Sequence, residues 1–379
     1  MRLTIEKLVY GGAGLARTEH GVVFVPRTAP GDVVEAELVE RKTDYALGRV
    51  TSLLEPSPDR QVPACPNYEN AGCCHWQHIR YSRQLEIKEA ILRETLQRIG
   101  RVTWEAPIAT LSGPDLAYRF RASFHVNKRK LGFMAEGSHT IVPVLRCSAL
   151  TAELNAFIPE ANEILATPAM AETREVHVVS GPPVLAAFDQ KRVGQGPARV
   201  KVKEWLFDLH PEAFFQTNHY LLRDFLEAVL VHGSGAKRVL DLFCGSGFFS
   251  IPLANHTSEV LGVEASRIAV KQAQLNARLN HVLNVEFFEG PVDEALRHSP
   301  DLRPDLIVIN PPRAGAGREV TALAAGLDAE RILYVSCNPS TFAREMPAIL
   351  ARGYTLAGIT LVDQFPNTYH IELVALFQK

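Results

Sequence analysis

The spacing of hydrophobic residues predicts a small β-domain at the start of the chain. Residues 1–56 contain short strand-like runs at 21–25 and 32–38, separated by turns that contain Gly and Pro. Closely spaced strands of this kind predict a small antiparallel barrel, the shape of the oligonucleotide-binding barrels. The Pro-rich stretch 55–59 indicates a linker. We therefore expect the first domain to span residues 1–56.

A helix and a sheet are predicted for the middle of the chain. Residues 80–100 carry Leu and Ile at helical spacing and end at a glycine, which predicts a helix. From residue 118 the apolar side chains fall on even positions as far as a polar turn at 127–130. Such alternation predicts a half-buried strand that enters a hairpin. Residues 57–204 should thus form a central α+β domain.

The remaining residues, 205–379, alternate buried runs with helix-like segments. The strand-like runs are 238–242, 259–263, 305–309, 331–335 and 372–377. Apolar strands interleaved with helices predict a mostly parallel, doubly wound sheet. The expected fold class is α/β: an N-terminal small β-barrel, a central α+β domain and a C-terminal Rossmann-like domain.

Composition narrows the class of protein. The 379 residues include 40 basic and 42 acidic residues, so no overall basic field indicates a nucleic-acid partner, and any RNA affinity must be local. No stretch reaches the roughly 18 apolar residues of a membrane span, and we expect a soluble cytoplasmic protein without a membrane partner. Three of the six cysteines lie within residues 65–74, which favours a metal or catalysis over a disulfide framework.

The loop after the first parallel strand contains Gly245 and Gly247 but lacks the third glycine of the dinucleotide fingerprint. Glu264 ends the second strand, 19 positions after Gly245, where an acid commonly binds ribose hydroxyls. Together these residues predict an adenosine ligand without a phosphate requirement, and S-adenosylmethionine is the commonest such cofactor. The alternative is a tight strand-to-helix turn with no ligand.

The later strands end in residues that can perform chemistry. Asn310, before two prolines, could present oxygen atoms to a base, or the loop could simply be rigid. Cys337 lies between a strand and a helix, so its sulfur should face the crevice, where helix N-terminal amides favour a thiolate. The alternative for this cysteine is inert packing. Glu372 interrupts an apolar run and must face a site or a partner, and a raised pKa there would suit a general base.

A cysteine and a carboxylate beside a methyl donor point to one reaction. C5 of a pyrimidine is a poor nucleophile until a thiolate adds at C6. C5 then accepts the methyl group, a base removes its proton, and the thiol is expelled.

These motifs together identify a family resemblance. The chain resembles the RNA uracil-C5 methyltransferases, which make 5-methyluridine in ribosomal and transfer RNA. The matching segments are 21–26 and 29–32, similar to the TRAM barrel that binds RNA, and 214–218, 240–247, 311–313, 336–339 and 363–372. The likeness covers almost the whole chain. It implies Cys337 as nucleophile and Glu372 as base.

The resemblance also implies the cofactor contacts. The residues expected to bind S-adenosylmethionine are Gln216, Phe243, Gly245, Gly247, Phe248, Glu264 and Asn310. Two positions depart from the family pattern, because Asn310 stands where an aspartate is usual and Phe248 where an asparagine is usual. Asn310 can still hydrogen-bond but cannot act as a base.

The cysteine segment resembles the iron–sulfur segment of that family. The implied ligands of a [4Fe-4S] cluster are Cys65, Cys73, Cys74 and Cys147. Ala71 occupies the usual position of one ligand, and Cys73 lies beside Cys74 instead. Zinc on the same sulfurs and reduced structural cysteines are the alternatives.

A basic segment offers contacts to RNA. Residues 117–135 contain five basic residues and no acidic one. Arg119 and Arg121 are the expected RNA contacts, whereas residues 128–130 could equally be a solvated hairpin tip. The target uridine must leave a stack or lie in a loop for C5 and C6 to be reached.

The expected substrate is 23S ribosomal RNA, with transfer RNA as the alternative, and no obligate protein partner is evident. Three other classes of protein stay open. An amino-methyltransferase acting on an exocyclic nitrogen leaves Cys337 and Glu372 without a role. An RNA-binding protein with a decayed site is favoured only by Asn310 and Phe248. A flavin or NAD oxidoreductase is the most distant alternative.

Overall fold

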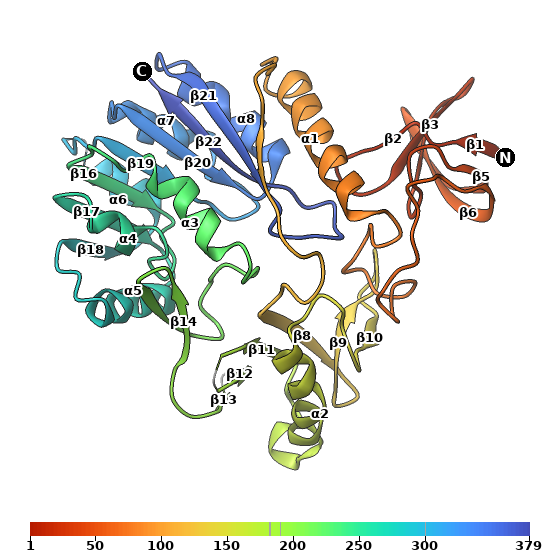
Figure 1. Cartoon of the computed structure of the whole chain (residues 1–379), viewed down its shortest axis with the longest axis horizontal. Coiled ribbons are helices and arrows are strands. Elements are labelled where there is room, and N and C mark those ends of the chain that lie inside the picture. The colour runs from red at the N-terminus through yellow and green to blue at the C-terminus, as the bar shows by residue number, and fades with distance from the viewer. Residues whose placement is uncertain (182, 190, 300) are drawn as a thin grey trace.

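The computed structural model describes residues 1–181, 183–189, 191–299 and 301–379. An N-terminal, a central and a C-terminal sheet lie at three corners of the molecule (Figure 1). Among the described residues, no helix has the length and apolar character needed to cross a membrane.

The N-terminal sheet is a six-stranded barrel-like unit in the order β1-β5-β6-β4-β3-β2. Its strands are β1 (Arg2–Thr4), β2 (Lys7–Leu8), β3 (Gly14–Thr18), β4 (Gly21–Val25), β5 (Val33–Arg41) and β6 (Tyr45–Glu55). The strands predicted at 21–25 and 32–38 are confirmed as β4 and β5. The sheet is not wholly antiparallel, because β4 pairs with β6 in parallel. Alternate residues such as Val23 and Val25 fill its small core.

The central sheet is antiparallel, in the order β10-β9-β8-β11-β12-β13. Its elements are β8 (Arg121–Asn127), β9 (Lys130–Met134), β10 (Ile141–Pro143), α2 (Ala152–Ala166), the short 3-10 helix Pro168–Met170, β11 (Glu175–Val179), β12 (Leu185–Phe188) and β13 (Lys191–Val193). The predicted hairpin at 127–130 joins β8 to β9. Phe124 and Ala122 in β8 are buried in the core shared with α2, and Val126 is partly buried there, as the alternation indicated.

The C-terminal sheet has eight strands in the order β18-β17-β16-β19-β20-β22-β21-β7. Its strands are β7 (Ala109–Leu111), β16 (Arg238–Leu242), β17 (Glu259–Glu264), β18 (Val285–Glu289), β19 (Leu306–Ile309), β20 (Arg331–Ser336), β21 (Thr355–Val362) and β22 (Glu372–Gln378). The strands from β18 to β20 are parallel, and β22 runs antiparallel between β20 and β21. The predicted doubly wound sheet is confirmed.

Helices cover both faces of this sheet, which explains its unbroken apolar strands. The helices are α1 (Tyr81–Arg98), α3 (Leu222–Leu230), α4 (Ser250–Ala254), α5 (Arg267–Leu279), α6 (Val292–His298), α7 (Arg318–Gly326) and α8 (Pro339–Leu350). In β19, Ile307 and Ile309 join the core on one face while Leu306 and Val308 join the core on the other. A strand that is buried on both sides has no polar face to show.

The expected boundary at 204/205 does not follow the packing. The hairpin of β14 (Ala198–Val202) and β15 (Trp205–Leu209) straddles it. The helix predicted at 80–100 is confirmed as α1, yet it packs against α8 in the core of the C-terminal sheet. Strand β7 extends that same sheet by pairing with β21. The domain limits therefore stay a prediction, and α1 connects the cysteine segment to the C-terminal sheet.

Candidate active site

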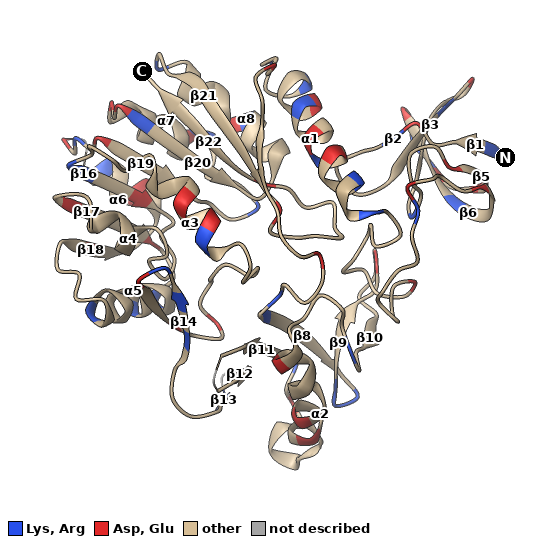
Figure 2. Cartoon of the chain, viewed as in Figure 1, with Lys and Arg blue, Asp and Glu red and all other residues tan. Residues whose placement is uncertain are grey.

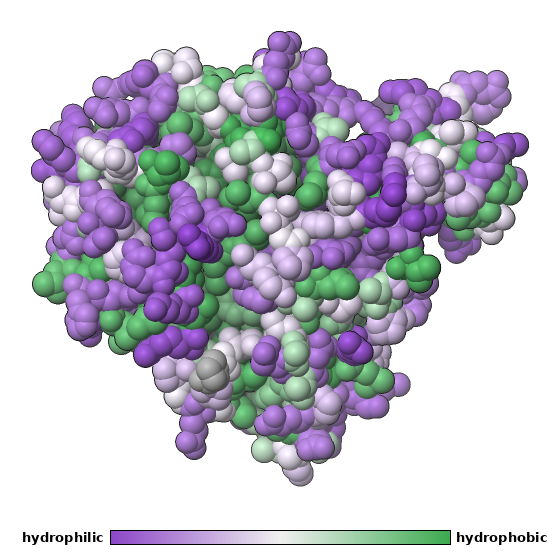
Figure 3. Space-filling view, viewed as in Figure 1, coloured by the Kyte–Doolittle hydropathy of each residue, from purple (hydrophilic) through white to green (hydrophobic). Residues whose placement is uncertain are grey.

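A cleft of about 780 Å³ lies between the central and C-terminal sheets. It is lined by Arg119, Arg121, Ala122, Ser123, Glu212, Phe214, Phe215, Gln216, Thr217, Phe243, Gly245, Glu264, Ala265, Ser266, Ala269, Asn310, Pro311, Pro312, Arg313, Cys337, Phe365 and Glu372. Figure 3 shows hydrophobic residues gathered in the hollow beside α3. Most of the predicted catalytic and cofactor residues meet here, because the parallel strands end at this edge of the sheet and the antiparallel strand β22 begins there.

One end of the cleft has a rigid acidic group. Both oxygens of the Glu264 carboxylate accept backbone hydrogen bonds, one from Gly245 N–H at 3.1 Å and one from Ser266 N–H at 2.7 Å. Phe243 and Gly245 have φ of 62° and 55°, which lets the chain turn sharply after β16. Each carboxylate oxygen keeps a lone pair, so the group can still accept hydrogen bonds from a diol.

Two residues of the expected cofactor set lie beneath this loop and not in the cleft wall. Phe248 is 5% exposed and packs edge to face on Phe215 and Phe249. A Cβ on Gly247 would approach Ile251 Cδ1 to 2.9 Å, so the glycine permits close packing with α4. Their placement indicates that they support the loop.

The other expected cofactor residues line the cleft. Gln216 is 6% exposed there. Asn310 follows β19, and its backbone N–H donates a hydrogen bond to the Leu242 carbonyl at 3.1 Å. Phe214 is 61% exposed, and its carbonyl accepts a hydrogen bond from Ser246 Oγ at 3.0 Å. The segment 214–217 is thereby joined to the glycine loop.

The two arginines that are predicted to contact RNA, Arg119 and Arg121, have different environments. The Arg121 guanidinium donates to the carbonyls of Pro211, Ala213 and Phe215, at 2.6 to 3.2 Å. Burial lowers the pKa of Arg121 to about 10, which leaves it charged at neutral pH. Arg119 donates through Nε to the Arg121 carbonyl at 3.1 Å and lines the cleft. The geometry gives Arg121 a role in shaping the segment that carries Gln216, and leaves Arg119 better placed for a ligand.

Cys337 and Glu372 are brought together by strand pairing. In the antiparallel ladder between β20 and β22, Ser336 is paired with Leu373. The next positions outward are Cys337 and Glu372, and both line the cleft. The two reactive residues thus reach one site from segments that are 35 positions apart.

The surroundings of Cys337 affect the protonation of its thiol. Burial, followed by the nearby Glu372 carboxylate, raises the pKa of the Cys337 thiol to about 11, while Arg313 opposes that rise. The first N–H groups of α8 do not donate to the Cys337 sulfur. Instead, Ser340 N–H and Thr341 N–H donate to Asn338 Oδ1, at 3.1 Å and 3.3 Å. The helix N-terminal amides that were expected to favour a thiolate are thus already hydrogen-bonded to Asn338, and the thiolate stays a prediction.

The expected raised pKa of Glu372 is present. Burial raises it to about 8, and the positive charge of Arg313 acts in the opposite direction. At neutral pH much of this carboxyl is protonated, and it can gain or lose a proton near the working pH.

A stability measurement can check this pKa. Because the carboxyl binds its proton more tightly when folded, its stabilising contribution is complete below pH 4.5 and is lost as the pH rises through about 8. Each unit of pKa difference corresponds to about 1.4 kcal/mol. We expect Glu372→Gln to raise the Tm by several degrees at pH 8.5 and to leave it unchanged at pH 4.5. An equal change at both pH values would contradict the raised pKa.

The cysteine segment brings its sulfurs together beside Tyr68. Cys65, Cys73 and Cys74 belong to one small cluster. Gln77 connects Cys65 to the neighbourhood of Cys147: its Oε1 accepts from Cys65 N–H and its Nε2 donates to Ser148 Oγ, both at 2.9 Å. Burial, followed by the charge of Cys73, raises the pKa of Cys147 to about 11. All six cysteines are free thiols, and no group of three or more ligating side chains in the described ranges has metal-binding geometry.

Several functional candidates had no role assigned from the sequence. Arg313 and Phe365 lie within motifs but were given no task, and the structure places both in the cleft wall. Lys88 was passed over entirely, although it interrupts the apolar stripe of α1 and is fully buried. A charged residue on the buried face of a helix is the signal that could have identified it.

The fold and site define a class of protein. The glycine loop, the fixed acid and the doubly wound sheet are typical of Rossmann-like methyltransferases, here with an additional N-terminal barrel. The chain belongs to the tRNA (uracil-5-)-methyltransferase family, whose model matches residues 185–297 and 298–379. The model of the TRAM domain of tRNA (uracil(54)-C(5))-methyltransferase matches residues 1–58.

Full-length relatives agree with this family. The chain is 34% identical to an uncharacterized RNA methyltransferase of Aquifex aeolicus, over 100% of this chain and 98% of that protein. It is 33% identical to the 23S rRNA (uracil(1939)-C(5))-methyltransferase RlmD of Pseudomonas putida, over 100% and 93% of the two chains. The crystal structure of the Pyrococcus abyssi tRNA (uracil-54, C5)-methyltransferase with S-adenosyl-L-homocysteine is similar over all of both chains, with a TM-score of 0.75 and 25% identity.

Proposed function

We propose that this protein transfers a methyl group from S-adenosylmethionine to C5 of a uridine in RNA. The observation that carries the proposal is the placement of Cys337 opposite Glu372, in the cleft that also contains Glu264. An amino-methyltransferase would need neither of the first two residues. The family of the chain supports the same reaction.

One group of cleft residues would bind the cofactor, and another would act on the uracil. When bound, S-adenosylmethionine supplies an electrophilic methyl group. Glu264 and the loop at Gly245 would hold its ribose, because that carboxylate is fixed with free lone pairs. Gln216 and Asn310 line the neighbouring part of the cleft and could contact either ligand.

Cys337 and Glu372 would carry out the chemistry on the base. The fraction of Cys337 that is ionised, a form that Arg313 favours, adds to C6, and the electron pair of the C5–C6 double bond makes C5 nucleophilic. After C5 has taken up the methyl group, the Glu372 carboxylate accepts the C5 proton. The double bond re-forms as the bond from sulfur to C6 breaks. Arg313 favours the charged forms of both side chains.

The proposed substrate is 23S ribosomal RNA, as in the Pseudomonas relative, with transfer RNA as the alternative. Either substrate implies a cytoplasmic enzyme. The test is transfer of labelled methyl groups to ribosomal and transfer RNA pools that lack 5-methyluridine. Label in only one pool identifies the RNA class, and label in neither, with both RNAs intact, would contradict the proposal.

We propose that Arg119 binds RNA phosphate or base edges at the mouth of the cleft. Figure 2 also shows basic residues at the turn between β8 and β9. Reversing the charge with Arg119→Glu should weaken RNA binding roughly tenfold at low salt. Lys130→Glu, at the hairpin tip, is the matched control and should have a smaller effect in the same filter-binding titration. Unchanged affinity for Arg119→Glu would remove Arg119 from the interface, and equal effects of the two variants would mean that net charge, and not a contact of Arg119, sets the affinity.

We also propose that Cys65, Cys73, Cys74 and Cys147 bind a [4Fe-4S] cluster. The clustering of Cys65, Cys73 and Cys74, and the hydrogen bonds of Gln77 that connect Cys65 to the residue after Cys147, support the proposal. Anaerobically purified protein should be brown and contain about four irons per chain, and Cys147→Ala should lower that content. Colourless protein without iron would contradict the cluster, and bound zinc would favour the alternative metal.

A further inference from the structure

A fully buried ion pair connects α1 to the loop before β22. Lys88 Nζ donates to Asp363 Oδ1 at 2.5 Å and to the Phe365 carbonyl at 3.0 Å, and both charged side chains are inaccessible to solvent. The other Asp363 oxygen accepts from the Tyr81 hydroxyl at 2.8 Å. Removing two charges from water costs more free energy than burying an apolar pair, so stability alone does not explain the arrangement.

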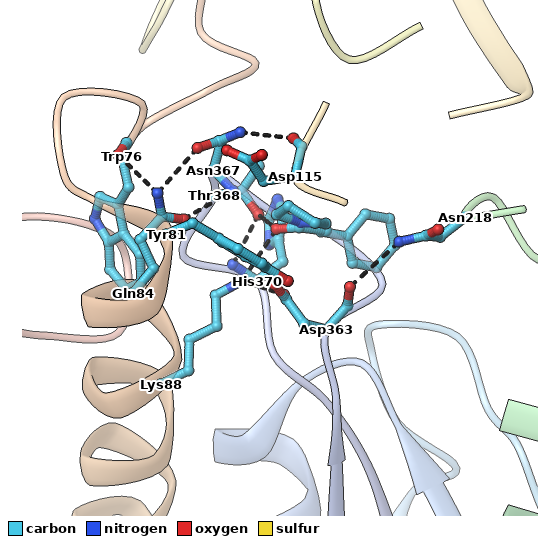
Figure 4. Close-up of polar contacts among 12 residues, drawn as sticks. Trp76, Tyr81, Gln84, Lys88, Asp115, Asn218, Asp363, Asn367, Thr368 and His370 are labelled. Carbon is cyan, nitrogen blue, oxygen red and sulfur yellow. Dashed lines mark hydrogen bonds and ion pairs between the residues drawn. The ribbon is translucent and has the colours of Figure 1, made fainter. Parts of the chain in front are cut away.

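A second contact holds the same loop one helical turn away (Figure 4). Gln84 Nε2 donates to Asn367 Oδ1, and Asn367 N–H donates to Gln84 Oε1, both at 2.9 Å. Tyr81, Gln84 and Lys88 follow one another at spacings of three and four, so they lie on one face of α1. That face binds the loop at both ends of residues 363–367.

The loop leads directly into the catalytic residue Glu372, although α1 itself does not line the cleft. Residues 363–371 connect β21 to Glu372, and Phe365 lines the cleft. The Asp363 carbonyl accepts from Asn218 Nδ2 at 3.4 Å, which connects the loop to the segment that contains Gln216. A shift of the loop would therefore move the carboxylate that removes the proton while leaving Cys337 on its own strand.

We propose that Lys88 is a positioning residue for Glu372, acting through Asp363 and the Phe365 carbonyl. The inference rests on the proposed function. In this proposal Lys88 affects the step in which Glu372 removes the C5 proton. It does not affect the addition of Cys337 to C6 of the uracil. Loss of Lys88 should therefore slow release of the methylated RNA after the covalent adduct has formed.

The test compares Lys88→Met with Arg98→Met, which changes an exposed arginine of the same helix. Lys88→Met should lower kcat about tenfold or more with little change in KM, and should accumulate a methylated protein–RNA adduct that survives a denaturing gel. Arg98→Met should do neither. The double variant Lys88→Met with Asp363→Leu removes both buried charges and should fold normally. It should accumulate the same adduct, because the hydrogen bond from Lys88 to the Phe365 carbonyl is also absent.

The outcomes separate the two proposals. A wild-type enzyme that makes 5-methyluridine, alongside a Lys88→Met variant with normal turnover, overturns only the positioning role. A folded double variant that loses activity without accumulating an adduct also overturns it. A wild-type enzyme that methylates RNA at another atom overturns the proposed function and this inference together.

Discussion

RNA methylation should fall by on the order of 10⁴-fold or more when Cys337 is replaced with alanine, because no other group can activate C5. Cys337 lies opposite Glu372 at the end of β20, and in the described part of the cleft no second thiol lines the wall. The cleft should stay intact, so binding of S-adenosylmethionine should be unchanged. Single-turnover transfer of a labelled methyl group, with cofactor binding measured in parallel, checks both expectations.

Cys244→Ala provides the matched control. Cys244 is buried in the glycine loop beside Gly262 and does not line the cleft. Its replacement should keep most of the activity. Residual activity of Cys337→Ala comparable to that of the control would show that methylation proceeds without a covalent step.

Glu372→Gln should trap the reaction after methyl transfer. The amide cannot accept the C5 proton, and the loss of a general base typically costs about 10² to 10⁴ in rate. Cys337 is unchanged, so addition to C6 and uptake of the methyl group should still occur. The expected product is a methylated protein–RNA adduct, detected as a labelled band of reduced mobility on a denaturing gel.

The double variant Cys337→Ala with Glu372→Gln is the control for this adduct, because it lacks the nucleophile and should give no band. An adduct in the double variant would mean that another residue is the nucleophile. Normal turnover by Glu372→Gln would assign the proton to a different base.

Much of the C-terminal fold could be predicted from the sequence, because buried strands and amphipathic helices have distinct periods. The strand at 238–242 has the bounds of β16, and the residues after each parallel strand do meet in one cleft. Strand order also explains Cys337 and Glu372, whose pairing depends on β22 inserting between β20 and β21. The sequence pattern could not show that insertion, and the two residues were connected only by the chemistry they could share and by the family resemblance.

Features that depend on long-range packing were not predictable. The roles of Gly247 and Phe248 beneath the cofactor loop depend on which neighbours surround them. The pKa of Cys337 depends on its burial and on the neighbouring Glu372 and Arg313. Lys88 and Asp363 are separated by 275 positions, and nothing in the sequence near either residue indicates that the two form an ion pair.

Release of tritium from C5 of uridine is the measurement that tests the central claim most directly. RNA carrying tritium at C5 of its uridines should lose it to water only when wild-type enzyme and S-adenosylmethionine are both present, with one tritium released per methyl group transferred. Cys337→Ala should release none. Methyl transfer without tritium release would place the methyl group on another atom and contradict C5 methylation.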